Sequence, residues 1–291
     1  MLSDVTRHSL CDRFSDVKLL DHGSLSLEDL MGDDHDVCRA ARISTRKANA
    51  KVDPTRDAKL IHYLMRQKHL SPFEQCEVKL HMRLPIFVAR QLLRTRTGSP
   101  NEMSGRYSEL PNDFYIPENE HIRKQDYANK QGSTEPVDEL TARRQSFGMR
   151  SVCEADFDQY HTGLDAGVAR ETARIVLPLG TYTEVIWKID LRNLLNFISL
   201  RMDSHAQYEI RVYADVMADI VKAWLPMVWG AFEQYVLHSV SVSWALIQAI
   251  TSSPETVAAI ERAVMAVSPS VVDFDATRKE FLAKLKSVPL A

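Results

Sequence analysis

Arginine side chains are concentrated in one short stretch of the sequence, RQLLRTRTGSPNEMSGRYSEL, which covers residues 90–110. Arg94, Arg96 and Arg106 stand in it together with Glu102 and many small polar residues. Arginine binds phosphate and carboxylate groups through two parallel hydrogen bonds, so it is a frequent side chain of anion sites. Glycine, proline and asparagine end the helical spacing of the preceding segment. The stretch therefore predicts an anion-binding loop that follows a helix.

A second group of polar side chains lies on a helix that the pattern predicts later in the chain. Arg192, Asn196 and Leu200 are four residues apart and share one helix face, and Arg201 and His205 share the neighbouring face. Such a face is too polar for a core and too apolar for free solvent. Two interpretations remain open, which are a ligand site and a salt-bridged face at a contact between subunits.

The remaining motifs narrow the chemistry. His205 and Glu209 have the i, i+4 spacing of a metal-binding pair, but no third ligand accompanies them, so no metal site is predicted. Ser104 lies outside any GxSxG motif, which argues against a hydrolase nucleophile. Neither GxGxxG nor GxxxxGK[ST] occurs. Residue patterns alone thus predict a multi-arginine site for an anionic ligand, for example a nucleotide.

Composition bounds the class of protein. The chain has 291 residues, 45% of them hydrophobic and 26% charged, with a net charge of -3. This is typical of a globular protein with a large core, and a slightly acidic total argues against coating of nucleic acid. The four cysteines are scattered without a CxxC pair, so neither a zinc site nor a disulfide framework is expected. No signal core or membrane-spanning apolar run is found, and a cytoplasmic location is expected.

Helices and strands that alternate along the chain are expected to position the candidate residues. A helix should begin at Asp53–Pro54, and residues 77–84 alternate as a strand does. Pro85 should open the helix that leads into the arginine-rich stretch. Before these elements, a strand is expected over residues 16–22, then a brief helical turn capped by Ser24 or Ser26 and interrupted by Gly32, and then a helix up to Ile43. After the arginine-rich stretch, a polar surface loop is expected over residues 117–136, a strand over residues 181–189, and helices over residues 137–163, 166–179 and 191–224. Further helices are expected after Tyr235, divided near Ser252–Pro254 and Ser268–Pro269.

The arginine-rich stretch resembles the signature of the flavin-dependent thymidylate synthases, the ThyX family. That signature runs Arg-His-Arg, a short spacer and Asn-Glu-x-Ser-x-Arg-Tyr, and here it is Arg94-Thr95-Arg96 followed by residues 101–107. Further blocks are similar in sequence and in order, namely RAARIS (39–44), HLSPFE (69–74), PIFVARQ (85–91), ARIVLPL (173–179) and NFISLRMDSHAQYEI (196–210). The resemblance covers roughly residues 16–235.

The resemblance implies a fold, an activity and an assembly. The fold would be α/β (α+β), with a central, mostly antiparallel sheet flanked by long helices and an extra helical C-terminal segment. The enzyme would be an FAD-dependent thymidylate synthase that converts dUMP to dTMP, with methylenetetrahydrofolate as carbon donor and NADPH as reductant. It would form a homotetramer with shared active sites. Together with the residue pattern outside the resemblance, the expected domains are a polar leader (1–15), a synthase domain (16–235) and a helical C-terminal extension (236–291).

The resemblance also implies roles for individual residues. Arg201 would be catalytic, because it would lie against the pyrimidine carbonyl and stabilise the developing anion. The residues implied to bind dUMP are Gln91, Arg94, Glu102, Ser104, Arg106, Arg174 and Arg201. The residues implied to surround FAD are Ser44, Ser71, Glu74, Arg94, Thr95, Arg96, Asn101, Glu102, Asp190, Arg192, Asn196, Leu200 and His205. No cysteine nucleophile is required.

Two positions depart from the family pattern. Thr95 stands where the family has the central histidine of its triplet, so the ring and its stacking surface are lost. Asp190 stands where an asparagine is common, which replaces an amide by a carboxylate near the expected flavin. The segment after Tyr235 is longer than is usual in the family, and we expect its helices on the exterior of the tetramer.

Two alternatives remain beside dTMP synthesis. Thr95 and Asp190 could favour hydroxymethyl transfer, which would yield 5-hydroxymethyl-dUMP on the same scaffold. The chain could also be a non-catalytic flavin- or nucleotide-binding protein whose C-terminal helices contact a protein partner. Neither nucleic acid nor a membrane is an expected partner.

Overall fold

The computed structural model of the chain describes residues 3–46, 51–266 and 274–286. Its chain divides into two compact units, each made of two segments. The first unit consists of Met1–Val37 and Ser71–Leu225, and the second of Cys38–Leu70 and Pro226–Ala291. The predicted domain boundaries after residues 15 and 235 stay a prediction. None of the helices within the described ranges is long and apolar enough to cross a membrane.

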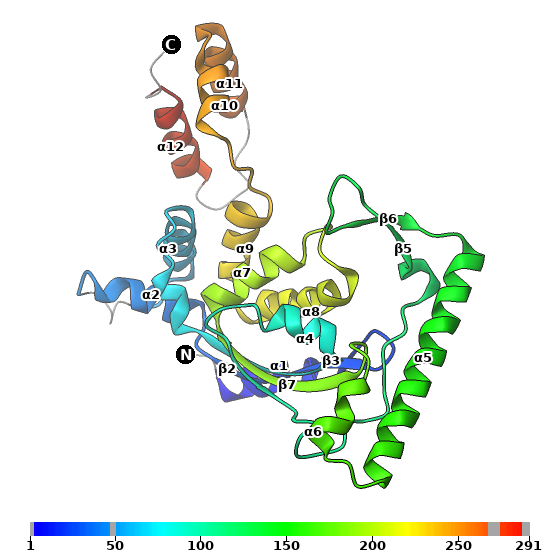
Figure 1. The fold of residues 1–291 in the computed structure, drawn as a ribbon. Coiled ribbons are helices and arrows are strands. Elements are labelled where there is room, and N and C mark those ends of the chain that lie inside the picture. Colours follow the sequence, from blue (N-terminus) through cyan, green and yellow to red (C-terminus); the bar gives the residue numbers. More distant parts are fainter. Residues whose placement is uncertain (1–2, 47–50, 267–273, 287–291) are drawn as a thin grey trace. The chain divides into compact units, whose positions relative to one another are not determined.

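A five-stranded antiparallel sheet lies in the first unit, in the order β1-β2-β3-β7-β4. Its three middle strands, β2, β3 and β7, are labelled in Figure 1. Its longest pairing joins β3 to β7, from Glu77 opposite Asp190 to Pro85 opposite Tyr182. Alternate side chains of both strands are buried, as their period-2 sequences predict. The strands are β1 (Val17–Leu19), β2 (Gly23–Met31), β3 (Glu77–Pro85), β7 (Tyr182–Asp190) and β4 (Ser99–Glu102). The sheet confirms the predicted fold class.

Strand β2 corrects one sequence-based prediction. Ser24 and Ser26 do not cap a helical turn, because this whole segment is a strand that pairs with β3. Leu25 and Leu27 alternate on the buried side, and a bulge between Leu27 and Asp29 brings Leu30 back to that side. The bulge hides the strand period in the sequence, which explains the error.

Helices α4, α7 and α8 pack against this sheet (Figure 1). The N-terminal segment also contributes, because Leu10 of helix α1 and the neighbouring Phe14 are buried. The backbone N–H of Leu27 donates to the carbonyl of Phe14 (3.0 Å), which ties the end of α1 to β2. The helices of this layer are α1 (Asp4–Arg13), α4 (Ile86–Leu92), α7 (Leu191–Arg201) and α8 (Tyr208–Trp224), with the 3-10 turn η1 (Ser71–Gln75) before β3.

A smaller apolar cluster holds the arginine-bearing segment around residues 170–176. Phe157 and Tyr160 of the long helix α5 (Glu139–Asp165) pack with Ala173 of α6 (Arg170–Ala173). The Tyr160 hydroxyl accepts a hydrogen bond from the backbone N–H of Leu110 (3.2 Å). Helix α5 therefore connects the end of the arginine-rich stretch with α6 and the following 3-10 turn η3 (Arg174–Val176).

Two predicted helices are shorter than expected. The helix predicted over residues 166–179 begins only at Arg170, after Gly167 in a left-handed conformation (φ 79°), and Pro178 keeps its predecessor out of helical geometry. The helix predicted over residues 191–224 is broken between α7 and α8. There the Asp203 carboxylate accepts the backbone N–H of His205 (2.8 Å), and a side chain that bonds locally competes with the helix. His205 therefore lies in a turn.

The polar segment over residues 117–136, predicted as a surface loop, contains a short hairpin. Strand β5 (Arg123–Gln125) pairs with β6 (Ser133–Pro136), and the 3-10 turn η2 (Asn119–His121) precedes them. The Gln125 amide donates to the backbone carbonyls of Asp126, Lys130 and Gly132. One side chain thus closes the hairpin from within.

The second unit is helical. Helix α3 (Pro54–Arg66) begins as predicted, with Asp53 accepting from the backbone of Thr55 and Arg56. It packs against α9 (Pro226–Phe232). The remaining elements are a π-helical segment (Glu233–Leu237), α10 (Trp244–Thr251), α11 (Pro254–Ala266) and α12 (Phe274–Lys286), while α2 (Asp34–Ile43) runs from the first unit into the second. The division near Ser252–Pro254 is confirmed, and Ser268–Pro269 lies outside the described residues.

Helix α12 is fastened to the end of α3 by one carboxylate. Arg66 donates from Nε and Nη2 to the two oxygens of Glu280 (3.1 and 3.2 Å), and Gln67 donates to the same group (2.9 and 3.0 Å). The Tyr235 and Thr277 hydroxyls meet at 3.0 Å beside it. Because the Arg66 side chain is only 11% exposed, this pair is less screened by solvent than an ordinary surface pair.

Replacing Glu280 with alanine should loosen α12 by about 1 kcal/mol, which corresponds to roughly fivefold faster amide exchange over residues 274–286. Hydrogen exchange with mass spectrometry measures this directly. Asp275→Ala is the matched control, because Asp275 makes a pair with Arg278 inside the same helix. Equal exchange rates in the two variants would contradict the role given to Glu280.

Candidate active site

A hollow of about 210 Å³ lies between the end of α4 and one face of α7. Six of the residues singled out from the sequence line it, and two others join them. The lining residues are Arg94, Thr95, Arg96, Asn193, Asn196, Phe197, Leu200 and Arg201. Tertiary structure therefore brings the arginine triplet segment and the predicted helix face together around one space.

Close packing at Gly98 positions the triplet. A Cβ at residue 98 would stand 2.2 Å from the indole nitrogen of Trp187, so only glycine lets the chain pass there. Trp187 is buried and packs edge-on against Phe197, with ring centroids 5.4 Å apart. After Thr97, which has a φ of 69°, the chain pairs with β7 as strand β4. The predicted loop is therefore a strand over its Ser99–Glu102 part.

Positive charge is concentrated at the hollow. Arg94, Arg96 and Arg201 contribute three guanidinium groups, and none of them forms an ion pair with another described residue. Guanidinium groups only donate hydrogen bonds and stay charged at any working pH. Three uncompensated cations around one hollow favour a ligand with negative charge or carbonyl oxygens.

Residues implied to bind the nucleotide gather around Gly105. The Ser104 hydroxyl accepts the backbone N–H of Arg106 (3.3 Å). The Arg174 side chain passes beside Gly105, with its Cδ 3.3 Å from the position that a Cβ would take there. Glu102 accepts a hydrogen bond from the Thr183 hydroxyl (3.0 Å). These contacts bring together the end of β4 and the η3 turn.

Arg106 is paired in this structure. Its guanidinium lies 2.8 Å from a carboxylate oxygen of Glu171 on α6, and both side chains are more than half exposed. An exposed ion pair of this kind contributes little free energy, so a phosphate can replace the glutamate at small cost.

Other predicted residues have protein partners of their own. The Gln91 amide donates to Gln207 (2.6 Å), and Arg192 forms an ion pair with Glu74. Arg192 is not among the residues that line the hollow. Ser71 and Asn101 are exposed on η1 and β4.

Three further predicted residues lie outside the hollow. Asp190 caps the N-terminus of α7. Ser44 is an exposed residue of the second unit. His205 Nδ1 lies 2.8 Å from Asp203 in the turn between α7 and α8.

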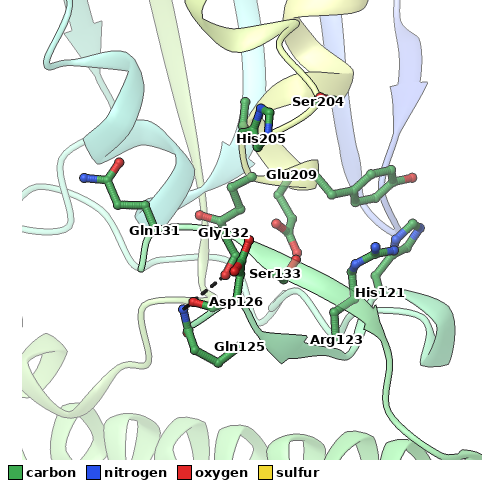
Figure 2. Close-up of a pocket in the computed structure, with 13 residues that line it drawn as sticks. His121, Arg123, Gln125, Asp126, Gln131, Gly132, Ser133, Ser204, His205 and Glu209 are labelled. Atoms are coloured by element: carbon green, nitrogen blue, oxygen red, sulfur yellow. Dashed lines mark hydrogen bonds between the residues drawn. The ribbon is translucent and has the colours of Figure 1, made fainter. Parts of the chain in front are cut away.

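His205 belongs to a second pocket, of about 320 Å³ (Figure 2). One side of this pocket is the β5–β6 hairpin, and the other is the turn before α8. The His121 ring stacks on Tyr208 with centroids 3.6 Å apart. The buried Glu209 accepts from the Tyr115 hydroxyl (3.1 Å), and burial together with this carboxylate raises the pKa of Tyr115 well above its usual range. Sequence reasoning did not foresee this pocket.

Comparison with known proteins identifies the family. Residues 26–227 match the family model described as thymidylate synthase complementing protein. Two curated proteins named flavin-dependent thymidylate synthase are similar to this chain. The protein from Wolbachia pipientis is 47% identical over 79% of this chain and 80% of its own length. The protein from Gluconobacter oxydans is 46% identical over 81% of this chain and 78% of its own length. The chain belongs to the flavin-dependent thymidylate synthase family.

A solved structure agrees with this membership in the ThyX family. The UMP/dUMP methylase PolB from Streptomyces cacaoi, bound with 5-Br dUMP, is 33% identical. The match covers 77% of this chain and 100% of that one, with a TM-score of 0.70. A second structure of PolB is bound with 5-Br UMP. Fold and sequence therefore point to the same family.

Asn193 and Phe197 are the lining residues that sequence reasoning missed. Residues 193, 196, 197, 200 and 201 follow the i, i+3, i+4, i+7, i+8 spacing of a single helix face. That pattern was available in the sequence. The i+4 series built on Arg192 found Asn196 and Leu200 of this face, but it began at a residue that pairs with Glu74 and passed over residues 193 and 197.

Three of the four cysteines of this ThyX-family chain are poor nucleophiles. Burial, together with the nearby Asp36 carboxylate, raises the pKa of the Cys76 thiol to about 12. Burial also raises the pKa of Cys11 and of Cys153. Because the thiolate is the reactive form, these three groups remain unreactive thiols at neutral pH.

Proposed function

We propose that this protein converts dUMP to dTMP, with methylenetetrahydrofolate as the carbon donor and NADPH as the reductant of a bound FAD. The observation that carries the proposal is the hollow at which the arginine triplet segment meets Asn196 and Arg201 of α7. Family membership supports the same reaction. A cytoplasmic location remains part of the proposal.

The residues at the hollow fit a flavin. Phe197 and Leu200 offer apolar surface to a ring, Asn196 and Thr95 offer hydrogen bonds, and the arginines offer charge for the cofactor's phosphates. A volume of 210 Å³ lies below the roughly 300–1,000 Å³ of pockets that enclose a drug-sized ligand, so this hollow holds only part of FAD. Bound FAD, once reduced, supplies the electrons that convert the transferred carbon unit into a methyl group.

The protein's own contribution is electrostatic. Arg201 is proposed to lie against a pyrimidine carbonyl and to stabilise the negative charge that develops on the uracil ring as its C5 attacks the carbon unit. An arginine cannot act as the base, because it stays protonated. Arg106 and Arg174 are proposed to bind the phosphate of dUMP, which helps the ground and transition states alike.

We also propose a homotetramer with shared active sites, because apolar side chains beside the proposed phosphate-binding arginines are exposed in the single chain. Tyr107 and Ile175, each adjacent to a proposed phosphate-binding arginine, are 84% and 76% exposed. Large apolar side chains beside a polar site are typical of surfaces that a second copy covers. Light scattering of the purified protein measures the assembly.

The decisive test is an oxygen-free mixture of protein, dUMP, methylenetetrahydrofolate and NADPH, with chromatography of the nucleotides. We expect dTMP. Protein that keeps FAD yet forms no dTMP would contradict the proposal. The 5-hydroxymethyl product would establish the second candidate, which the position of Thr95 at the hollow favours. A parallel mixture with UMP tests the ribonucleotide, because PolB binds 5-Br UMP.

Thr95→His restores the family's aromatic ring and is expected to tighten FAD binding about threefold to tenfold, because an aromatic contact adds roughly 0.5–1.5 kcal/mol. Fluorescence titration of the flavin-free protein measures the change. An unchanged dissociation constant would show that the ring at this position does not contact the cofactor.

A further inference from the structure

The first turn of α7 contains a paired carboxylate and amide. Asp190, the N-cap of the helix, accepts the backbone N–H of Asn193 through Oδ1 (3.0 Å). Its other oxygen, Oδ2, accepts the side-chain Nδ2 of Asn193 (2.7 Å). Both carboxylate oxygens are therefore directed to one residue, and that residue lines the hollow whereas Asp190 does not.

This pairing determines which end of the Asn193 amide faces Asp190. An ionised carboxylate only accepts hydrogen bonds, so the amide nitrogen must face it. The carbonyl oxygen is the other branch of the same planar group, so it is not the atom that contacts Asp190. Among the described residues, no other side-chain hydrogen bond involves Asn193. Its Oδ1 is therefore an acceptor that remains available.

The neighbours of Asn193 at the hollow make this acceptor significant. Arg94, Arg96 and Arg201 can only donate. A ligand with one N–H between two carbonyl groups, an imide edge, needs donors on both sides of an acceptor. The flavin ring and the uracil ring both carry such an edge.

We propose that Asn193 Oδ1 accepts the imide N–H of the ring bound in the hollow, and that Asp190 is a positioning residue that orients the Asn193 amide. This inference rests on the proposed function, because it takes the ring to be that of flavin or uracil. It also changes the interpretation of Asp190. The carboxylate does not replace an amide that would touch the flavin, since its effect reaches the ligand through Asn193.

Asp190→Asn is the sharpest test. Asparagine caps helices as well as aspartate does, so α7 should keep its stability. The new amide, however, presents an N–H₂ group to Asn193, whose amide then turns its oxygen toward residue 190 and its nitrogen into the hollow. A donor would face the imide N–H, and affinity for the ring should fall roughly tenfold.

The double variant Asp190→Asn with Asn193→Asp should restore binding. In it, the residue 190 amide donates to one oxygen of the carboxylate introduced at position 193, and the other oxygen again offers an acceptor to the hollow. Asp138→Asn is the matched control, because Asp138 is the N-cap of α5 and accepts from Thr141 (2.9 Å) outside the hollow. The control should bind both ligands as the unmodified protein does.

Two titrations distinguish the possible rings. FAD is titrated into flavin-free protein without nucleotide, and dUMP is titrated into FAD-loaded protein by equilibrium dialysis, with the thermal midpoint recorded for each variant. Weaker FAD binding, together with a shifted flavin absorption band, supports contact with flavin. Weaker dUMP binding alone supports contact with uracil. For either ring, the inference also requires that the double variant restore the affinity lost in Asp190→Asn.

The outcomes that contradict the inference are also distinct. If the unmodified protein makes dTMP and Asp190→Asn binds both ligands with unchanged affinity, the inference is wrong and the proposed function stands. If Asp190→Asn lowers ligand affinity only as far as it lowers the thermal midpoint, and the double variant does not restore the affinity, then Asp190 stabilises helix α7 and does not orient Asn193. An unmodified protein that binds neither FAD nor dUMP contradicts the proposed function and the inference together.

Discussion

Arg201→Ala should lower kcat for dTMP formation about 100- to 1,000-fold while the protein keeps its FAD. Arg201 is the last residue of α7 and lines the hollow with two other arginines. Removal of one preorganised group that stabilises developing charge typically costs this much in turnover. Cofactor affinity should change only a few-fold, because Arg94, Arg96 and Asn196 remain. Stopped-flow and steady-state assays give kcat, and the visible flavin spectrum gives occupancy.

Two further variants qualify the Arg201 result. Arg201→Lys should recover part of the turnover, since it keeps the charge but not the planar pair of donors. Arg143→Ala, which removes one side of an exposed pair with Glu139 on α5, should behave like the unmodified protein. Loss of flavin from Arg201→Ala, with normal turnover after FAD is added back, would place this arginine at the cofactor instead of at the pyrimidine.

Asp57→Ala should lower the free energy of unfolding by about 3–5 kcal/mol. Arg42 and Asp57 form a 2.5 Å ion pair between α2 and α3, and their side chains are only 8% and 2% exposed. Another guanidinium nitrogen of Arg42, Nη1, is buried without a hydrogen-bond partner among the described residues. Without Asp57 the charge of Arg42 would stay buried and uncompensated. Denaturant unfolding followed by circular dichroism measures the loss.

A double replacement separates the charge from the volume. Arg42→Met with Asp57→Leu removes both charges, and it should recover most of the stability, because apolar pairs of similar volume often replace buried ion pairs at no net cost. Glu139→Ala, from an exposed pair, should cost less than about 1 kcal/mol. A loss below about 1 kcal/mol for Asp57→Ala would show that water reaches the pair.

Local sequence signals predicted the elements that carry the site. The alternation in residues 77–84 and the β-branched and aromatic residues of 181–189 identified the two central strands, and Asp53 and Pro85 marked helix starts that the structure has. The errors arose where one contact overrides periodicity. The bulge after Leu27 conceals a strand, and the Asp203 side chain interrupts a helical pattern.

The composition of the site was predictable in part. Residues of the family signature could be named from the sequence, and six of the residues singled out there line one hollow. Their partners could not be named, because ion pairs such as Arg192 with Glu74 join residues more than a hundred positions apart. The pairing of Arg106 with Glu171 likewise depends on how α6 packs against α5.

The sequence by itself determined the chemistry available to this protein, which is a set of arginines, amides and small polar residues in the order of the flavin-dependent thymidylate synthases. Tertiary structure alone decided which of these groups meet. Helix α7 turns Asn193 and Phe197 toward the arginine triplet segment because Trp187 packs under Gly98 and against Phe197. Asp190, three residues before Asn193, instead accepts hydrogen bonds from the backbone N–H and the side-chain amide of that residue. Spacing specifies a helix face, but only packing between distant segments specifies what that face is turned toward.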